Sequence, residues 1–273
     1  MERASLARLV MCLITLLIGV DARATGSATA NISDLTVQLS DLAPDDGVAP
    51  QVTFSGYALA SGWLDPLASF PTRPSPDPIQ TFFQPGPTVP NAFSWSDAAM
   101  SSGNMSSRAI ITATSLTATV SATGTGTAVA QAYSGSAYDP FQGLWLSLSP
   151  HTSMTISAVA AVQALSDGAV LGPFYWQFAE SRADVSLNIV DLTGQHSLGG
   201  YDGLAIDTYF GPGNVDAGRT LSVTYSNTSD TVEGLGFYAT AEAISTSVVS
   251  EPSPLSLIVP VIASVLYVRR RSS

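Results

Sequence analysis

The sequence predicts an all-β fold, an antiparallel β-sandwich of the jelly-roll-like kind, and three observations lead to this prediction. Apolar side chains recur with a period of two, as in Leu35-Thr36-Val37-Gln38-Leu39. Turn-forming dipeptides such as Asp46-Gly47 and Asp167-Gly168 end the alternating runs. No stretch of ten or more residues in the body has a convincing period of 3.6, so we expect no substantial helix outside the two ends of the chain.

The first alternating runs lie at residues 35–39 and 51–55, with turn-forming residues at 44–47 between them. We expect these runs to form a hairpin with a long loop. Alternation is then lost, and eight of the seventeen prolines fall between Pro66 and Pro90, where they cannot donate a ladder hydrogen bond. The sequence therefore predicts one irregular, Pro-rich excursion over residues 58–107, whose aromatic rings either pack it over one end of the sheet or face a ligand.

Alternation resumes at Ile110 and predicts a strand to residue 122, with Leu116, Ala118 and Val120 on the core face. Further strands are expected at residues 128–133, 144–148, 154–162, 185–189, 221–225 and 235–243. Loops rich in glycine and aspartate are expected at 199–203 and 211–214. About eight to ten strands in all are consistent with a single sandwich domain over residues 25–249.

Composition excludes several kinds of chemistry from this body. Residues 25–250 hold four arginines against eighteen carboxylates, whereas nucleic acid requires clustered positive charge, so we expect no nucleic-acid partner. Lysine is absent from the chain, which removes Schiff-base chemistry and P-loop phosphate binding. The one cysteine, Cys12, precedes the body, which therefore has no disulfide or thiolate metal site. We expect no cofactor.

Residues 1–24 have the pattern of a secretory signal peptide, which we expect to be helical. Arg3 and Arg8 precede an apolar run over residues 9–20, and Ala22 and Ala24 are small residues at the positions that a signal peptidase reads. The apolar run is too short for a permanent membrane span. We therefore expect export and cleavage after Ala24.

The tail, residues 250–273, combines three features in order: Glu251-Pro252-Ser253, an apolar run over residues 255–268, and Arg269-Arg270-Arg271. The apolar run is shorter than the roughly 17–25 residues that cross a bilayer comfortably. Snorkelling arginines and local thinning of the bilayer can offset that deficit. Because arginines stay on the cytoplasmic side, we expect a C-terminal transmembrane helix with the body outside.

This tail resembles that of the bacterial PEP-CTERM proteins, which carry a Pro-Glu-Pro motif, a membrane-spanning segment and an arginine cluster in the same order. Ser250 stands where that family usually has its first proline. The resemblance covers about a tenth of the chain. It implies retention in the inner membrane, processing near Glu251-Pro252 by an exosortase-type membrane transpeptidase, and association with extracellular polysaccharide. A plain membrane anchor with a Pro-rich neck would satisfy the same bilayer physics.

Candidate binding residues in the body are aromatic or acidic. Four tryptophans are candidates for stacking on sugar rings, which would make the body a lectin-like carbohydrate-binding module: Trp63, Trp95, Trp145 and Trp176. Aspartates among glycines, where oxygen ligands for Ca²⁺ collect, are Asp45, Asp46, Asp202, Asp207 and Asp216. Turn formation accounts for these aspartates better than a metal does, since no EF-hand spacing is present.

A secreted hydrolase would depend on His151 or His196, the only histidines. No G-x-S-x-G element places a nucleophile beside either, and isolated histidines more often face solvent or cap a turn. We therefore assign no catalytic residue. The leading interpretation is an exported structural protein of the cell surface or extracellular matrix, with a carbohydrate-binding module as the alternative.

Overall fold

The computed structural model describes residues 24–55, 58–65, 81–83, 96–112, 114–134, 144–167, 170–171, 176–191, 197–209 and 212–249. This described part consists of antiparallel strands and contains no helix, which confirms that the fold of the body is all-β, as predicted. The strands are β1 (Thr25–Asp41), β2 (Val52–Ser55), β3 (Ala58–Asp65), β4 (Thr81–Phe83), β5 (Ser96–Ser102), β6 (Met105–Ile111), β7 (Leu116–Thr123), β8 (Gly126–Ser134), β9 (Leu144–Leu148), β10 (Thr152–Ser166), β11 (Val170–Leu171), β12 (Trp176–Val190), β13 (Ser197–Asp207), β14 (Gly213–Asn227) and β15 (Glu233–Val249).

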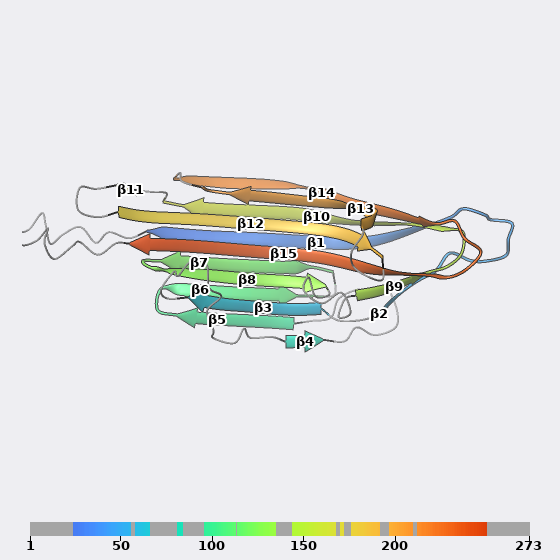
Figure 1. The fold of residues 1–273 in the computed structure, drawn as a ribbon, viewed down its shortest axis with the longest axis horizontal. Coiled ribbons are helices and arrows are strands. Elements are labelled where there is room, and N and C mark those ends of the chain that lie inside the picture. The colour runs from blue at the N-terminus through green and yellow to red at the C-terminus, as the bar shows by residue number, and fades with distance from the viewer. Residues whose placement is uncertain are drawn as a thin grey trace, which may run out of the picture.

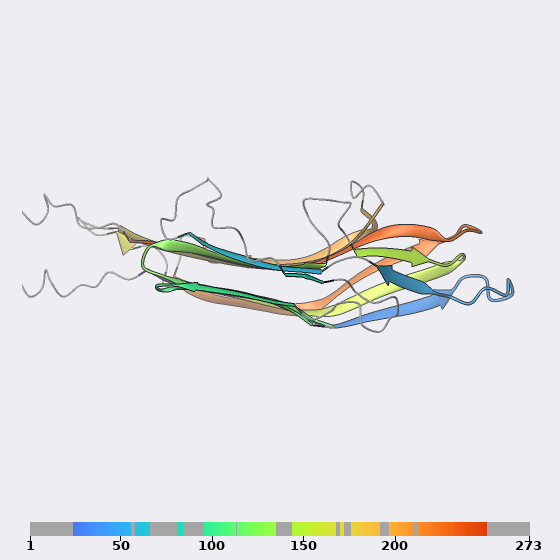
Figure 2. The ribbon, with the colours of Figure 1, turned by 90° about the horizontal axis from the view of Figure 1, so that it is seen from below.

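The strands form two antiparallel sheets that face each other as two long layers (Figures 1 and 2). Sheet A has the order β14-β10-β1-β7-β6-β5. Sheet B has the order β11-β12-β15-β8-β3-β4, with β13 paired to β12 and β9 joining β15 to β2. A register shift between Ser33 and Thr36 marks a β-bulge in β1, where Asp34 adopts a positive φ of 53°. Such a bulge bends its strand, and Figure 2 shows sheet A bending along its length.

The hydrophobic core lies between the sheets and changes in character along them. Inward positions near the start of β1 are small, and a Cβ added to Gly26 would lie 2.5 Å from Ser245 Oγ and 2.7 Å from Ser181 Oγ. Farther along, the core consists of large side chains such as Ile32, Leu187 and Phe237. The small residues near the start of β1 therefore let side chains of the facing sheet approach the β1 backbone closely.

Two predicted connections are wrong. The runs at 35–39 and 51–55 are strands, but they form no hairpin, because β1 pairs with β7 and β10 in sheet A while β2 pairs with β9 in sheet B. The strand predicted over 110–122 is interrupted by a turn, in which the Thr112 N–H donates to the Ser115 carbonyl. Crossing this turn shifts the alternation by one residue, so Ile111, and not Ile110, is buried.

Residues 58–107 are not one irregular excursion. They include β3, β4, β5 and the first three residues of β6. The inward residues of β3 are small apart from one leucine, namely Ala58, Ala60, Gly62 and Leu64, so the strand lacks the strong alternation of large apolar side chains. The loop predicted at 199–203 is likewise part of β13, in which Gly200 adopts a positive φ of 84°.

The first and last described residues meet at one turn. The Gly124 N–H, in the turn between β7 and β8, donates to the Ala24 carbonyl at 2.9 Å, and the Val249 N–H donates to Thr125 Oγ1 at 3.1 Å. The predicted signal helix and C-terminal helix lie outside the described residues. Within the described residues, no helix has the length and apolar character that a membrane span requires.

Candidate functional site

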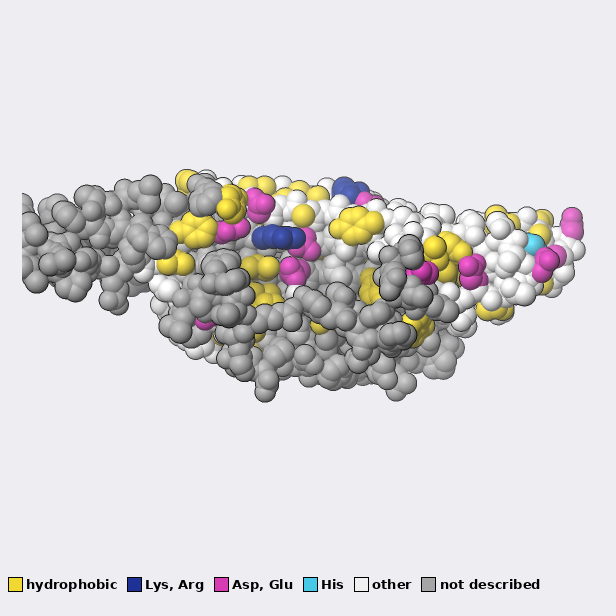
Figure 3. Space-filling model, in the orientation of Figure 1, with side chains coloured by type: hydrophobic (Ala, Val, Ile, Leu, Met, Phe, Trp, Pro, Cys, Tyr) yellow, Lys and Arg dark blue, Asp and Glu magenta, His cyan; other side chains and the backbone are white. Residues whose placement is uncertain are grey.

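The strand registers bring a polar group together on the outer face of sheet B. Gln131 of β8 lies opposite Glu242 of β15, and Glu242 lies opposite Asp184 of β12. The Gln131 amide donates to a Glu242 carboxylate oxygen, and Arg182 Nη2 lies 3.0 Å from Asp184 Oδ2. We call Gln131, Arg182, Asp184 and Glu242 the carboxylate cluster. Figure 3 shows this face of the molecule, with acidic side chains gathered around a basic one over its middle.

The environment of the cluster disfavours full ionisation. Burial raises the pKa of Asp184, the Glu242 charge raises it further, and Arg182 only partly opposes both effects. The Arg182 side chain is 53% exposed, so solvent screening limits the stabilising effect of the Arg182–Asp184 pair. Glu180, two residues before Arg182, also has a raised pKa because of burial and then of the Asp207 charge. Two facing carboxylates and an arginine could bind sugar hydroxyls through charge-assisted hydrogen bonds.

We predict that Asp184→Asn raises the free energy of unfolding at pH 7 by about 0.2–1 kcal/mol, the range for cross-strand pairs. A carboxyl with a raised folded-state pKa stabilises the fold when protonated. This contribution is complete below the ordinary pKa of 3.8 and is lost as pH rises through the folded-state value. The gain from Asp184→Asn should therefore shrink between pH 7 and pH 4, as measured by urea denaturation.

The matched control is Asp97→Asn on sheet A. A hydrogen bond from Arg108, with Nη2 2.7 Å from Asp97 Oδ2, lowers the pKa of Asp97. Its contribution is therefore present above the ordinary pKa and is lost in acid, so Asp97→Asn should leave stability at pH 7 unchanged or lower it slightly. If Asp184→Asn were less stable than the unaltered protein at pH 7, this would contradict the inference that burial and the Glu242 charge disfavour the Asp184 carboxylate.

The tryptophans do not form one platform. Trp63 on β3 and Trp145 on β9 are half-buried and both lie on the outer face of sheet B. Through β8, Trp63 is in register with Ile244 of β15, whereas Trp145 pairs directly with Gly236 of the same strand. These two positions on β15 are eight residues apart, so the two tryptophans are separated by about 26 Å along the strand direction. Trp95 lies outside the described residues. Trp176 begins β12, and the position of its side chain is not described.

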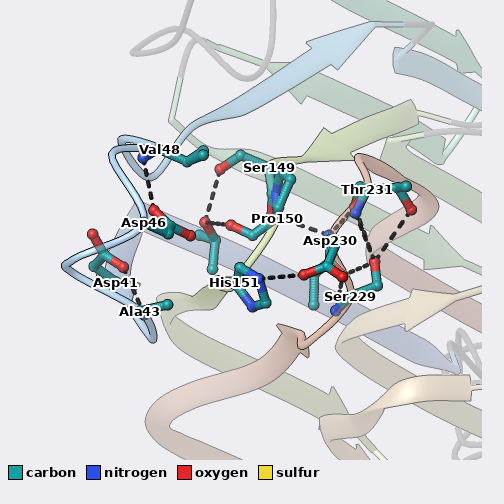
Figure 4. Close-up of polar contacts among 12 residues, drawn as sticks. Asp41, Ala43, Asp46, Val48, Ser149, Pro150, His151, Ser229, Asp230 and Thr231 are labelled. Atoms are coloured by element: carbon teal, nitrogen blue, oxygen red, sulfur yellow. Dashed lines mark hydrogen bonds and ion pairs between the residues drawn. The ribbon is translucent and has the colours of Figure 1, made fainter.

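The calcium candidates are also separate. Asp46 Oδ1 accepts a hydrogen bond from the Val48 N–H at 2.7 Å, which is a turn-forming role, in the loop that also holds Asp45 (Figure 4). Asp202 and Asp207 lie on opposite faces of β13. No group of three or more His, Cys, Asp and Glu side chains within the described ranges could hold a metal ion.

Asp202 instead ties the two sheets together at their rim. It accepts hydrogen bonds from the Arg219 guanidinium and, at 2.8 Å, from the Ser222 N–H of the edge strand β14. Partial burial alone would raise the pKa of Asp202, but these donors outweigh that effect and lower it. The carboxylate thereby blocks part of an open sheet edge, and edges of this kind otherwise invite pairing with another chain.

His151 lies in the turn between β9 and β10, at the end of the sheets opposite Ala24 and Val249 (Figure 1). Its Nε2 is 2.8 Å from Asp230 Oδ1 in the turn between β14 and β15 (Figure 4). The Asp230 side chain is 95% exposed, whereas the aspartate of a hydrolytic triad is buried. This pair therefore links two turns and does not resemble a triad. His196 lies outside the described residues.

The sorting residues Glu251, Pro252, Ser253, Arg269, Arg270 and Arg271 and the cleavage-site residue Ala22 also lie outside the described residues. Ala24, the other cleavage-site residue, is buried.

The sequence did not predict the carboxylate cluster, because its residues are far apart in the chain and the sequence does not show which outward residues of different strands lie opposite each other. The only indication of the cluster in the sequence was that Asp184 and Glu242 each alternate with the apolar residues of a predicted strand, and so were expected on its polar side.

No known protein family, curated protein or solved structure matches this chain.

Proposed function

We propose that this chain is an exported structural protein of the cell surface or extracellular matrix, delivered by its N-terminal segment and processed at its tail near Glu251-Pro252. The observation that carries the proposal is the meeting of Ala24 and Val249 at the turn between β7 and β8. Both predicted targeting segments thus adjoin one end of the body. A tail in the inner membrane would then hold the body by that end, with the opposite end directed outward.

The length of the strands supports this role. A strand of 17 residues, such as β1 or β15, extends about 56 Å at 3.3 Å per residue. The turns at the far end, which hold Asp46, His151 and Asp230, would stand that far from the attachment point. An elongated body of this kind suits a spacer or matrix component. The jelly-roll-like connectivity and the association with exopolysaccharide belong to the same proposal.

The alternative is a secreted carbohydrate-binding module of the lectin-like type. It is favoured by one observation, the placement of Trp63, Trp145 and the carboxylate cluster on a single sheet face. Flat sheet faces with aromatic rings and hydrogen-bonding groups are suited to sugar rings. Saturable binding of a soluble polysaccharide that is lost in Trp145→Ala would favour this alternative, because it would assign the binding to this sheet face.

The test is the intact mass of the protein, together with its location, in bacteria that carry an exosortase-type enzyme. We expect the mature form to lack residues 1–24 and the arginine-rich tail, and to lie outside the cytoplasm. Glu251→Ala should leave the tail in place and the protein in the membrane fraction. Glu233→Ala, which changes a carboxylate in the body, is the control and should be processed normally.

Two results would oppose the proposal in different ways. An intact chain in the soluble cytosol would refute export. Membrane protein that keeps its tail both in the unaltered chain and in Glu251→Ala would show a plain anchor in place of a sorting signal.

A further inference from the structure

Tyr201 is an exposed aromatic residue on the outer face of sheet B, and its side chain is 67% exposed. The register places it opposite Asn188 of β12. Asn188 follows Asp184 of the carboxylate cluster by four residues and therefore lies on the same face of the strand. Figure 3 shows hydrophobic side chains beside the acidic group on this face. Tyr201 thus presents its ring to solvent on the face that holds the carboxylate cluster.

Gly203, two residues farther along β13, determines how this ring lies. A Cβ added to Gly203 would be 2.5 Å from Tyr201 Oη and 2.9 Å from Tyr201 Cζ. The end of the ring therefore occupies the space that any other side chain at position 203 would fill. As a result, the Tyr201 side chain lies along β13 and does not stand out from the sheet. The ring is held over the strand backbone while most of its surface stays open to a ligand.

Polar side chains on the neighbouring strands lie level with the ring. Gly203 faces Ser186 of β12, whose Oγ is 2.7 Å from Thr240 Oγ1 of β15. Asn188 Oδ1 accepts a hydrogen bond from Ser197 Oγ at 2.8 Å, and an amide whose oxygen accepts still has two N–H donors. The surroundings of the ring thus offer donors and acceptors together, which suits sugar hydroxyls because each of these both donates and accepts.

The carboxylate cluster lies close to this ring. Ala205, two residues beyond Gly203 on β13, pairs with Asp184 of β12. The Cα atoms of Gly203 and Asp184 are therefore about 8 Å apart, from about 6.6 Å along the strand and 4.8 Å across it. A polysaccharide that extends from the ring over β12 would bring its next hydroxyls to the cluster, whose carboxylates accept charge-assisted hydrogen bonds.

We propose that Tyr201, held over Gly203, is the stacking platform for a neutral polysaccharide whose hydroxyls bind the polar side chains of β12 and β15. An aromatic ring with hydrogen-bonding groups around it matches a sugar, which has apolar C–H faces and polar edges. Charge selects against other occupants. The cluster sets two carboxylates against Arg182, so an acidic polysaccharide would meet like charge, as would a second copy placed face to face.

This inference deepens the association with polysaccharide proposed above and rests on it for the class of ligand. It depends neither on export nor on processing of the tail, which the intact mass tests separately. It also differs from a site at Trp145, since β9 is three strands away from β13 in sheet B, about 14 Å across the sheet. Variants at the two positions therefore distinguish the two sites.

The test is affinity electrophoresis of the full-length chain in a polyoxyethylene detergent, which has no sugar headgroup. The gels contain dextran, a soluble β-1,3-glucan or galactomannan as neutral probes, and alginate as an acidic probe. We expect at least one neutral probe to retard the protein and alginate to have no effect. Tyr201→Ala should raise the Kd for that neutral probe at least about fivefold, as for an aromatic anchor. Val159→Ala, which shortens a 45% exposed side chain on the outer face of sheet A, is the control and should bind normally.

Gly203→Ala is the sharper variant, because it keeps Tyr201 and places a methyl group where the end of the ring lies. It should weaken binding about as much as Tyr201→Ala does, and circular dichroism establishes folding for each variant. The proposal is overturned if no neutral probe retards the unaltered chain, if alginate retards it as strongly, or if either folded variant binds as the unaltered chain does. Binding that is lost in Trp145→Ala but kept in Tyr201→Ala would also overturn it, while leaving a carbohydrate-binding role at Trp145.

Discussion

Replacing Phe237 with alanine is expected to lower the free energy of unfolding by about 3–5 kcal/mol, the range for large-to-small changes at buried aromatic residues. Phe237 on β15 is fully buried, and its ring meets that of Phe54 on β2 edge to face, with centroids 6.3 Å apart. The core around it cannot collapse easily, because β15 is paired on both edges by β9 and β12. Urea denaturation followed by circular dichroism measures the loss.

Tyr201→Ala is the control for removal of a ring, since Tyr201 is 67% exposed and its loss should change stability by no more than about 0.5 kcal/mol. A double-mutant cycle with Phe54→Ala should give a coupling free energy of about 0.5–1.5 kcal/mol for the two rings. Additive single changes would show that the edge-to-face contact contributes nothing beyond burial. Equal effects of Phe237→Ala and Tyr201→Ala would contradict the described core.

Asn227→Ala should destabilise the protein by about 2–3 kcal/mol, because it leaves several buried backbone groups without a partner. The fully buried Asn227 side chain ends β14. Its amide nitrogen lies within hydrogen-bonding distance of three carbonyl oxygens, those of Leu148 at 3.2 Å, Ser149 at 3.1 Å and Thr231 at 2.8 Å. Its Oδ1 accepts from the Ser229 N–H at 3.0 Å. One side chain thus joins the end of β9 to the turn between β14 and β15.

Asn214→Ala tests the same substitution at the other end of β14, where the side chain is exposed and accepts one long bond of 3.5 Å from Gln163. We expect it to be nearly neutral. Thermal unfolding should show a drop of several degrees for Asn227→Ala and almost none for Asn214→Ala. Similar melting temperatures for the two variants would remove Asn227 from its assigned role.

The sequence predicted the inward faces of long strands better than the strand pairing. Val185, Leu187 and Ile189 of β12 are buried as expected, since large apolar residues alternate there with polar ones. The strand β3 was missed because Ala60 and Gly62 face inward, and such small residues give little hydrophobic contrast. They fit because serine side chains of the facing sheet, such as Ser107, approach them closely.

Pairing could not be read from the chain, because it depends on contacts between residues far apart. Nothing local places Asp184 opposite Glu242, 58 positions later. The turn at residues 112–115 was missed for a related reason, since threonine and serine suit a strand as well as a turn stabilised by the Thr112 hydroxyl. Predicting the candidate site would therefore have required the strand register of sheet B, whereas predicting the fold class required only the periodicity of the apolar residues.

The position of β15 also bears on how the body would respond to mechanical force. Its last residue, Val249, pairs with Gln177 of β12, and the strand is flanked by β12 on one edge and by β8 and β9 on the other. A pull on the chain beyond Val249, directed along the strand, would load these ladders in shear and not one bond at a time. Many hydrogen bonds would have to break together before β15 could slide, which is the arrangement expected of a load-bearing tether.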